Sequence, residues 1–232
     1  LKVGELQHFS DASNTRTKNT TQTYDEYGNV TVSKEYGDTA SAVDQRATYF
    51  GYAKNPSKYI VDRLASRAVR VGHEPSGQKL SEEQFDYDGS ASLGSVSGKG
   101  VLHSRKEWTG SGGNFVETAS YVYNAQGSVI QERDAIGALT VNTYSGAFLT
   151  STVGPEGYRT DTVWNQSCQA PSSETSVGGG VTTTSYDQVC RMSVVRSPEG
   201  QATHYGYYNW GNPNGQFIQT RIYNLSNPSE YV

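Results

Sequence analysis

The sequence is poor in the residues that dominate helical and membrane-spanning proteins. It contains one Met, only 34% of its 232 residues are hydrophobic, and its mean hydropathy is −0.66. A transmembrane helix needs about 18 or more consecutive apolar residues, and because no such run occurs we expect no membrane span. No charged and then apolar segment marks a secretion signal at the N-terminus. The chain begins with Leu1, so we expect a piece of a longer protein, for which a missing signal means little.

Two further scarcities exclude two other classes of protein. The 19 Lys and Arg residues are interspersed with 23 Asp and Glu residues, and the formal net charge is −4. Nucleic-acid binding requires a concentrated cationic surface, so the sequence predicts no nucleic-acid partner. Two cysteines are too few for a small fold that depends on disulfides.

The residues that are abundant favour short β-strands joined by tight turns. The sequence has 17 Tyr and 25 Gly residues, and Thr, Ser and Val are frequent. Tyr, Thr and Val suit a pleated and half-buried surface, whereas Gly supplies the backbone conformations that tight turns require. The composition therefore predicts an all-β fold.

An aromatic residue, called here an anchor, recurs every 20 to 22 residues through the second half of the chain. These anchors are Tyr123, Tyr144, Trp164, Tyr186 and Tyr207, and Tyr24 holds a similar place near the N-terminus. The fourth residue after most of the second-half anchors is Gly or Cys, namely Gly127, Cys168, Cys190 and Gly211, with Phe148 as the exception. Such a regular period indicates a repeat architecture.

A second turn signal lies midway through each repeat, at 134–137, 154–157, 177–180 and 197–200. Each repeat is therefore a strand, a turn, a second strand and another turn, with strands expected over 128–133 and 138–144 in one example. One hairpin is marginal in water, but a row of hairpins buries one face continuously. The period is too short for a propeller blade, which takes roughly 40–45 residues.

Several motifs carry a resemblance to a known family. They read Tyr24-Asp25-x-x-Gly28-Asn29-Val30, Tyr121-x-Tyr123-Asn124-x-x-Gly127-x-Val129, Asp134-x-x-Gly137-x-x-Thr140-x-x-x-Tyr144 and Tyr186-Asp187-x-x-Cys190-Arg191. They resemble the YD-repeat signature of Rhs proteins. Residues 36–61 and the tail 211–220 are similar to the Rhs region that follows the SpvB-like and β-propeller parts of Tc-toxin B components. The resemblance covers most of 20–224.

The resemblance implies an all-β ribbon of tandem antiparallel hairpins that curves into part of a hollow shell. Residues 1–120 would be an irregular Rhs-like hairpin segment with long loops, and 121–232 would be regular YD repeats of about 21 residues in one continuous array. The shell encloses a toxic C-terminal polypeptide, so the partners would be the other repeats and the toxin of the same polypeptide. The protein would be secreted, or delivered from a bacterial surface, and this segment would not be an enzyme.

The motifs of self-cleavage and of other chemistry are missing from the sequence. The family's cleaving aspartates belong to an Asp-Pro-x-Gly-type motif, but 155–157 and 198–200 lack the preceding Asp. No nucleophile elbow and no complete dinucleotide-binding fingerprint occur, and the four histidines lack metal-ligand spacing. Residues 86–89 resemble the start of a calcium loop without its later ligands. We therefore expect no catalytic, cofactor or metal site.

The aromatic residues leave an alternative function open. The regularly spaced tyrosines are expected to stack as a ladder between adjacent hairpins, although they could also offer a platform for sugars. Trp108 and Trp210 do not follow the repeat and are the candidates for a local contact. The alternative is therefore a surface or adhesion module that binds carbohydrate or protein through exposed aromatics.

Cys168 and Cys190 hold the same position in consecutive repeats. Equivalent residues of stacked hairpins lie roughly 5–10 Å apart, and a disulfide needs Cα atoms about 4.4–6.8 Å apart. A bond would close a loop of about twenty residues, add roughly 3 kcal/mol and indicate an oxidising compartment. Two thiols that fill space as small apolar groups are the other option, and the sequence leaves both open.

Overall fold

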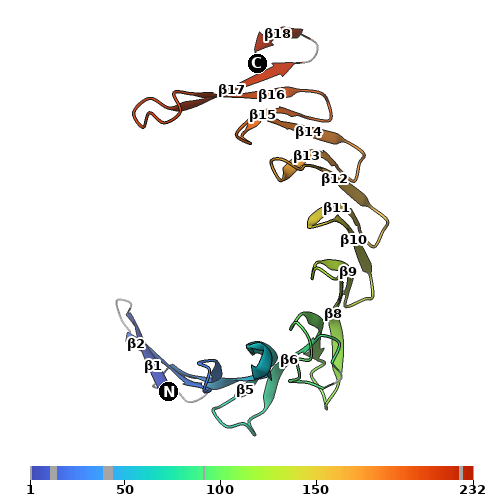
Figure 1. Cartoon of the computed structure of the whole chain (residues 1–232). Helices are drawn as coiled ribbons and strands as arrows, with labels where there is room; N and C mark the ends of the chain where they lie inside the picture. The colour runs from blue at the N-terminus through green and yellow to red at the C-terminus, as the bar shows by residue number, and fades with distance from the viewer. Residues whose placement is uncertain (1, 11–14, 39–43, 91, 225–226, 232) are drawn as a thin grey trace. The chain divides into compact units, whose positions relative to one another are not determined.

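The computed structural model describes residues 2–10, 15–38, 44–90, 92–224 and 227–231. Its regular structure consists of strands and one short 3-10 helix, with no α-helix in these ranges. Among the described residues, strands that are consecutive in the chain pair in antiparallel fashion. The prediction of an all-β chain of antiparallel hairpins is confirmed (Figure 1).

The chain divides into two compact units. Unit 1 comprises Leu1–Val122 with Glu132–Ala138, and unit 2 comprises Tyr123–Gln131 with Leu139–Val232. The strands of the first part of the chain are β1 (Lys2–Ser10), β2 (Thr15–Tyr24), β3 (Val30–Asp38), β4 (Arg46–Asn55), β5 (Ile60–Val71), β6 (Lys79–Tyr87), β7 (Leu102–Trp108) and β8 (Phe115–Tyr123). The remaining strands are β9 (Val129–Asp134), β10 (Leu139–Ser145), β11 (Phe148–Val153), β12 (Arg159–Asn165), β13 (Ala170–Thr175), β14 (Val181–Tyr186), β15 (Met192–Arg196), β16 (Ala202–Tyr208), β17 (Phe217–Asn224) and β18 (Asn227–Tyr231).

One turn geometry recurs at both ends of the hairpins. In the example that begins at Asn124, the N–H of Gly127 donates to the Asn124 carbonyl and the Asn124 N–H donates to Ser128. Gly127 has a φ of 92°, in the left-handed region that favours glycine. The same pair of hydrogen bonds closes the turns that begin at Asp25, Asp134, Gly154, Ser176, Asp187 and Ser197. Most of the turn signals read from the sequence therefore have one physical basis, with the turns of Cys168 and Gly211 as exceptions. Strands β9 and β10 each start one residue later than expected.

Unit 1 contains a small core that lies under a long loop. Ala53, Ala65, Tyr87 and Val96 are buried together, and partly buried Ile60, Phe85 and Leu102 pack against them. The Gly- and Ser-rich stretch 89–100 is exposed only in part, at residues 89, 92–94, 97 and 99. Val96 within it is only 4% exposed, because the loop folds back over β4 and β5.

Side chains from two elements hold this loop in place. Asn55 Nδ2 donates to the Val96 carbonyl at 2.9 Å, and Lys58 Nζ donates to the Ser97 carbonyl at 2.6 Å. Asn55 is the last residue of β4, and Lys58 is the last residue of the 3-10 helix Pro56–Lys58, which precedes β5. A second Gly-rich stretch, 110–114, is exposed.

Unit 2 has almost no enclosed core. Among its described residues only Ser151 and Ala202 are buried, and most strand residues are half-buried or exposed. A single layer of this kind cannot depend on close-packed apolar side chains in the way that a two-layer domain does. Its hairpins must instead be held to one another by specific links, which define the candidate site.

Candidate functional site: bridged and stapled hairpins

A β-bulge lies directly before most of the anchors. The pairing register shifts between Thr143 and Tyr144, between Val163 and Trp164, and between Ser185 and Tyr186. The same shift precedes Tyr24, Tyr52 and Tyr87 in unit 1. A bulge adds one residue to one strand, bends it and increases its twist. The hairpins of these six residues are therefore bent at the point where the aromatic side chain leaves the strand.

The anchors of unit 2 bridge the gaps that open between consecutive hairpins. The Trp164 Nε1–H donates to the Leu149 carbonyl at 2.7 Å, and Tyr186 OH donates to the Pro171 carbonyl at 2.7 Å. Tyr207 OH donates to the Met192 carbonyl at 3.0 Å. Each of these bonds spans 15 residues of sequence.

The bridges are needed because consecutive hairpins pair with each other over only a few residues. Strand β13 pairs with β14 only from Ser173 to Thr175, opposite Val181–Thr183. Beyond that point the two strands pair with their other neighbours, and the Pro171 carbonyl has no partner in the β13–β14 ladder. An unpaired backbone carbonyl costs free energy when it is shielded from water. The phenol of Tyr186 supplies the missing donor, so the anchor acts as a side-chain extension of the ladder.

The other anchors follow the pattern in part. Tyr24 OH donates to Gln22 Oε1 on its own strand at 2.7 Å. Beside Tyr144, Asn142 Nδ2 makes the corresponding backward link, to the Val129 carbonyl at 3.1 Å. Tyr123 is the half-buried last residue of β8.

Two tyrosines of unit 1 make bridges that the sequence period did not identify. Tyr52 OH donates to the Val30 carbonyl and Tyr87 OH donates to the Leu64 carbonyl, both at 2.9 Å. Their spans are 22 and 23 residues, because the hairpins of unit 1 are longer. The feature that the two share is a shift of the pairing register directly before the tyrosine, and only Tyr87 also ends its strand.

We expect Tyr186→Phe to lower the free energy of unfolding of unit 2 by about 1 kcal/mol, the usual net value of a hydrogen bond to a shielded carbonyl. The ring and its packing are retained, so the loss reports the bridge alone. Tyr158 is 58% exposed, and Tyr158→Phe serves as the matched control, with an expected change of a few tenths of a kcal/mol. Urea denaturation followed by far-UV circular dichroism measures both, and equal values for the two variants would contradict a bridging role.

The residue after the anchor fixes the turn through its carboxylate. Asp187 Oδ1 accepts the N–H groups of Val189 and Arg191, at 3.0 and 2.9 Å, and Oδ2 pairs with the Arg191 guanidinium at 2.7 Å. The Arg191 N–H is the main reason that the pKa of Asp187 is lowered. Asp25 holds the equivalent turn of unit 1 in the same way, accepting from Tyr27 and Asn29. The hydrogen bond from Lys54, at 2.6 Å, is the main cause that lowers the pKa of Asp25.

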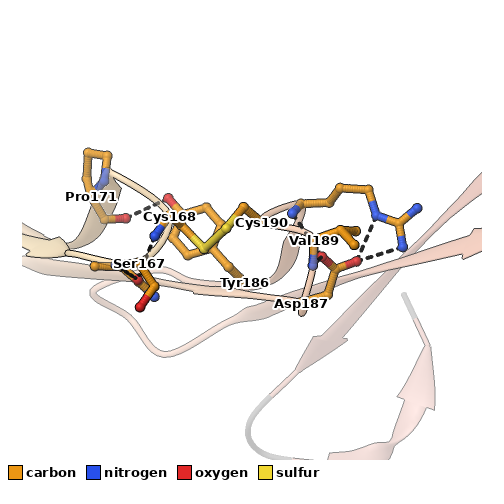
Figure 2. Close-up of a disulfide and its surroundings, with 9 residues drawn as sticks. Ser167, Cys168, Pro171, Tyr186, Asp187, Val189 and Cys190 are labelled. Atoms are coloured by element: carbon orange, nitrogen blue, oxygen red, sulfur yellow. Dashed lines mark hydrogen bonds and ion pairs between the residues drawn. A yellow bond between two sulfur atoms is a disulfide. The ribbon is translucent and has the colours of Figure 1, made fainter.

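A disulfide joins two turns at one end of neighbouring hairpins (Figure 2). Cys168 lies in the turn between β12 and β13, Cys190 lies in the turn between β14 and β15, and their Cα atoms are 5.2 Å apart. Of the two options that the sequence left open, the structure contains the bond. Figure 2 also shows Tyr186 reaching Pro171 close to it. The staple, as this disulfide is called below, and the anchor bridge therefore connect the same pair of hairpins.

The two cysteines replace glycine in different ways. Cys190 keeps the recurring turn geometry, with a φ of 63° where the other turns have Gly. The turn of Cys168 differs, because Asn165 pairs with Ala170 and the left-handed residue is Gln169, with a φ of 51°.

Trp108 and Trp210 belong to different units and have different surroundings. The Trp108 Nε1–H donates to the Gly112 carbonyl at 2.9 Å, and Lys79 Nζ lies 4.9 Å from the centre of the ring. The Trp108 ring is therefore engaged within its own hairpin. Trp210 is 69% exposed, and the Arg191 guanidinium lies between it and Tyr207, at 5.0 and 4.2 Å from the two ring centres.

The described residues contain no group of three or more His, Cys, Asp or Glu side chains arranged to hold a metal ion. The Asp88 carboxylate, which the sequence placed in a motif similar to a calcium loop, accepts backbone N–H groups from Gly98, Gly100 and Val101. Within the same ranges, no helix has the length and apolar character needed to cross a membrane.

No family model and no curated protein matches the chain. Among solved structures, it is similar to TcdB2-TccC3 without its hypervariable C-terminal region, with 14% identity and a TM-score of 0.42 over 94% of this chain and 14% of that one. TcdB2-TccC3-TEV gives 13% identity and a TM-score of 0.41 over 90% of this chain and 14% of the other. A porin-like protein from Bacteroides uniformis has 12% identity to this chain and a TM-score of 0.28, and the match covers 95% of this chain and 94% of that one. Identities this low and TM-scores below 0.5 assign neither a family nor a function, and the chain spans only 14% of the first two structures' chains.

Proposed function

We propose that this chain is a non-catalytic wall segment of an Rhs-type shell, which encloses a C-terminal toxin polypeptide of the same large protein. The observation that carries the proposal is the repeated bridge from Trp164, Tyr186 and Tyr207, each to a carbonyl 15 residues earlier. A device that links consecutive hairpins suits a wall, because a wall must keep its repeats together with little core. The Tyr-Asp motifs that resemble YD repeats coincide with these bridges and turns.

The pairing of charges supports a role without catalysis. Arg105 contacts Glu83 and Glu107 at 2.6 and 2.7 Å, and Arg67 contacts Glu83 at 3.4 Å. Lys106 pairs with Asp86 at 2.6 Å. A general acid or base needs a pKa near the working pH and access to a substrate, whereas these carboxylates are occupied by cations.

The staple supports a secreted location. Disulfides persist in oxidising compartments and are rare in the cytosol. Loss of the staple would leave β13 and β14 joined by three residue pairs and the Tyr186 bridge. The partners in this proposal are the remaining repeats and the toxin of the same polypeptide.

Peptide-mapping mass spectrometry of the native protein that contains this segment tests the proposal. We expect a polypeptide several times longer than this segment, with a C-terminal piece that is cleaved from it and remains associated. A native chain of about the length of this segment would overturn the shell, because these hairpins alone cannot enclose a polypeptide. That result would favour the alternative of a surface module, for which the exposed ring of Trp210 is the supporting observation.

A further inference from the structure

Three departures from the repeat occur close together in unit 2. Trp164 is a Trp where the neighbouring anchors are Tyr, and Phe148 stands where most repeats have Gly or Cys. The third departure is a pair of charges, Arg159 and Asp161, at the first and third strand positions after a turn. The corresponding residues of the other repeats are Leu139 and Val141, Val181 and Thr183, and Ala202 and His204.

All of these departures line one open hollow of about 490 Å³ formed by β10, β11 and β12. The Phe148 and Trp164 rings lie 5.0 Å apart between centres, with their planes inclined at 38°. The Arg159 Nε contacts the two oxygens of Asp161 at 2.8 and 2.9 Å, and Nη2 contacts Oδ1 at 2.7 Å. Phe148, Arg159 and Asp161 differ from the residues at the corresponding positions of the other repeats, so their convergence beside Trp164 indicates a local role.

The Trp164 ring has a fixed orientation in the hollow. Its Nε1–H is bonded to the Leu149 carbonyl at 2.7 Å, so the ring edge is held while the side chain remains half-buried. An aromatic side chain that is positioned before binding loses little conformational entropy when a ligand stacks on it. Beside it, the exposed Val163 extends the apolar surface of the hollow.

The polar groups can recognise neighbouring hydroxyls. A guanidinium has five N–H donors in a fixed plane, and an ionised carboxylate accepts only. Asp161 engages only Nε and Nη2 of Arg159, and the Arg159 side chain is 62% exposed, so its other N–H groups can donate to a ligand. Thr143, Thr150 and Gln166 add hydroxyl and amide groups at the rim.

The charge balance of the hollow decides the class of ligand. Arg159 and Asp161 neutralise each other, and no other charged residue lines the hollow, so it offers no net attraction to an ionic ligand. A mixed aromatic and polar lining of this volume is typical of small-molecule sites. A pyranose ring has an apolar face of C–H groups and a rim of hydroxyls, which match the two parts of the lining.

We propose that this hollow binds a neutral pyranose unit of a glycan, stacked against Trp164 and Phe148 and held through its hydroxyls by Arg159 and Asp161. The site shares Trp164 with the proposed wall role, because the bridge to Leu149 also fixes the ring in the hollow, whereas Phe148, Arg159 and Asp161 are not among the residues on which that role rests. The length of the native polypeptide tests the wall and the binding of a sugar tests the hollow, so the two proposals can fail separately.

The test follows the three Trp indole N–H signals of the 232-residue chain in ¹H–¹⁵N NMR spectra, with Trp164→Phe used to assign the Trp164 signal. The probes are hexasaccharides of β-glucose, α-mannose and N-acetylglucosamine at millimolar concentration, and a polygalacturonate oligomer as a charged comparison. We expect at least one neutral hexasaccharide to shift the Trp164 signal in a saturable way, without shifts at Trp108 or Trp210. If no neutral probe shifts it, or if the charged oligomer shifts it most, the proposal is wrong.

A matched pair of double variants separates the site from the fold. Arg159→Ala with Asp161→Ala keeps the net charge and the aromatic rings, and we expect binding at least about tenfold weaker, the loss that corresponds to one charged hydrogen bond. Val181→Ala with Thr183→Ala changes the corresponding positions of the next repeat and should leave the affinity unchanged. An equal effect of the two double variants would overturn the assignment of the site to this hollow.

Discussion

Reduction of the Cys168–Cys190 staple is expected to lower the free energy of opening of hairpins β12–β13 and β14–β15 by roughly 3 kcal/mol. The bond closes a loop across a sequence separation of 22 residues. Without the bond, the unfolded chain regains the conformational entropy that the closed loop had removed. Nothing in unit 2 compensates with a large core, since only Ser151 and Ala202 are buried among its described residues. Native-state hydrogen exchange of peptides from β12 to β15, with and without reductant, measures the change.

The backbone at Cys190 makes the choice of replacement informative. A side chain in the left-handed region costs about 1–2 kcal/mol relative to the right-handed region, and glycine avoids this cost. With the φ of Cys190 at 63°, Cys168→Ser with Cys190→Gly should be about 1 kcal/mol more stable than Cys168→Ser with Cys190→Ser. Both variants lack the bond, so the difference between them reports the turn alone.

The control for this experiment is the Asp134 turn, which is of the same kind and has no disulfide. Its amide protection should be unchanged by reductant and by both double variants. Unchanged protection of β12–β15 after reduction, verified by thiol labelling, would show that the staple does not stabilise the hairpins. A serine variant as stable as the glycine variant would show that the left-handed conformation at 190 carries no cost.

The elements that the sequence predicted well are those determined by local chemistry. Gly127, Gly137, Gly157 and Gly200 each occupy the left-handed position of the same turn, and a residue with that conformational freedom is visible in the sequence. The period of about 21 residues follows from two such turns and two short strands. As a result, strands β9 and β10 begin and end only one residue later than the sequence predicts.

The anchor bridges could not be predicted in the same way, because two of the three, from Trp164 and Tyr186, follow a bulge. A bulge needs one extra residue and has no composition of its own, so the sequence does not show that Trp164 leaves its strand toward Leu149. The sequence identified the anchors as a stacked ladder, whereas the structure uses Trp164, Tyr186 and Tyr207 as hydrogen-bond donors. In unit 1 the hairpins are longer and irregular, so Tyr52 and Tyr87 mark units in the sequence without belonging to the regular period, and their bridges span 22 and 23 residues.

The loop 88–101 shows how composition alone can mislead. Its many Gly and Ser residues are typical of an exposed connection, but the loop is organised by one carboxylate. Asp88 accepts N–H groups from Gly98 at 2.7 Å, from Gly100 at 3.0 and 3.1 Å, and from Val101 at 3.2 Å. We call this arrangement the Asp88 latch. Small residues are needed there because their backbones must converge on one side chain.

Asp88→Ala is expected to destabilise unit 1 by about 2 kcal/mol, because it leaves the N–H groups of the latch without their acceptor. The loop would then separate from the core, and Val96, now 4% exposed, would become accessible. Asp88 also has a φ of 55°, which Asn tolerates as well as Asp does. Asp88→Asn is therefore the matched variant: it keeps the backbone conformation, loses the charge, and should cost less than Asp88→Ala.

The latch also predicts a pH dependence. Desolvation alone would raise the pKa of Asp88, but the N–H groups of Gly98, Gly100 and Val101 outweigh it and hold the pKa below the ordinary value of 3.8. A carboxyl whose pKa is lower in the folded state stabilises that state above its unfolded pKa and loses the effect as pH falls through the folded pKa. The latch should therefore be intact at neutral pH and open only below about pH 3.8.

The amide NMR signals of Gly100 and Val101, followed from neutral to acidic pH, measure this opening. In the unmodified chain both should shift together with a midpoint below 3.8, and in Asp88→Asn this step should be missing. The turn amides of Tyr27 and Asn29, which the carboxylate of Asp25 holds in the same unit, serve as an internal reference, because Asp88→Asn leaves their titration unchanged. A midpoint at or above 3.8 for Gly100 and Val101 would mean that their N–H groups do not stabilise the charged form, and the loop would then be held by Asn55 and Lys58 alone.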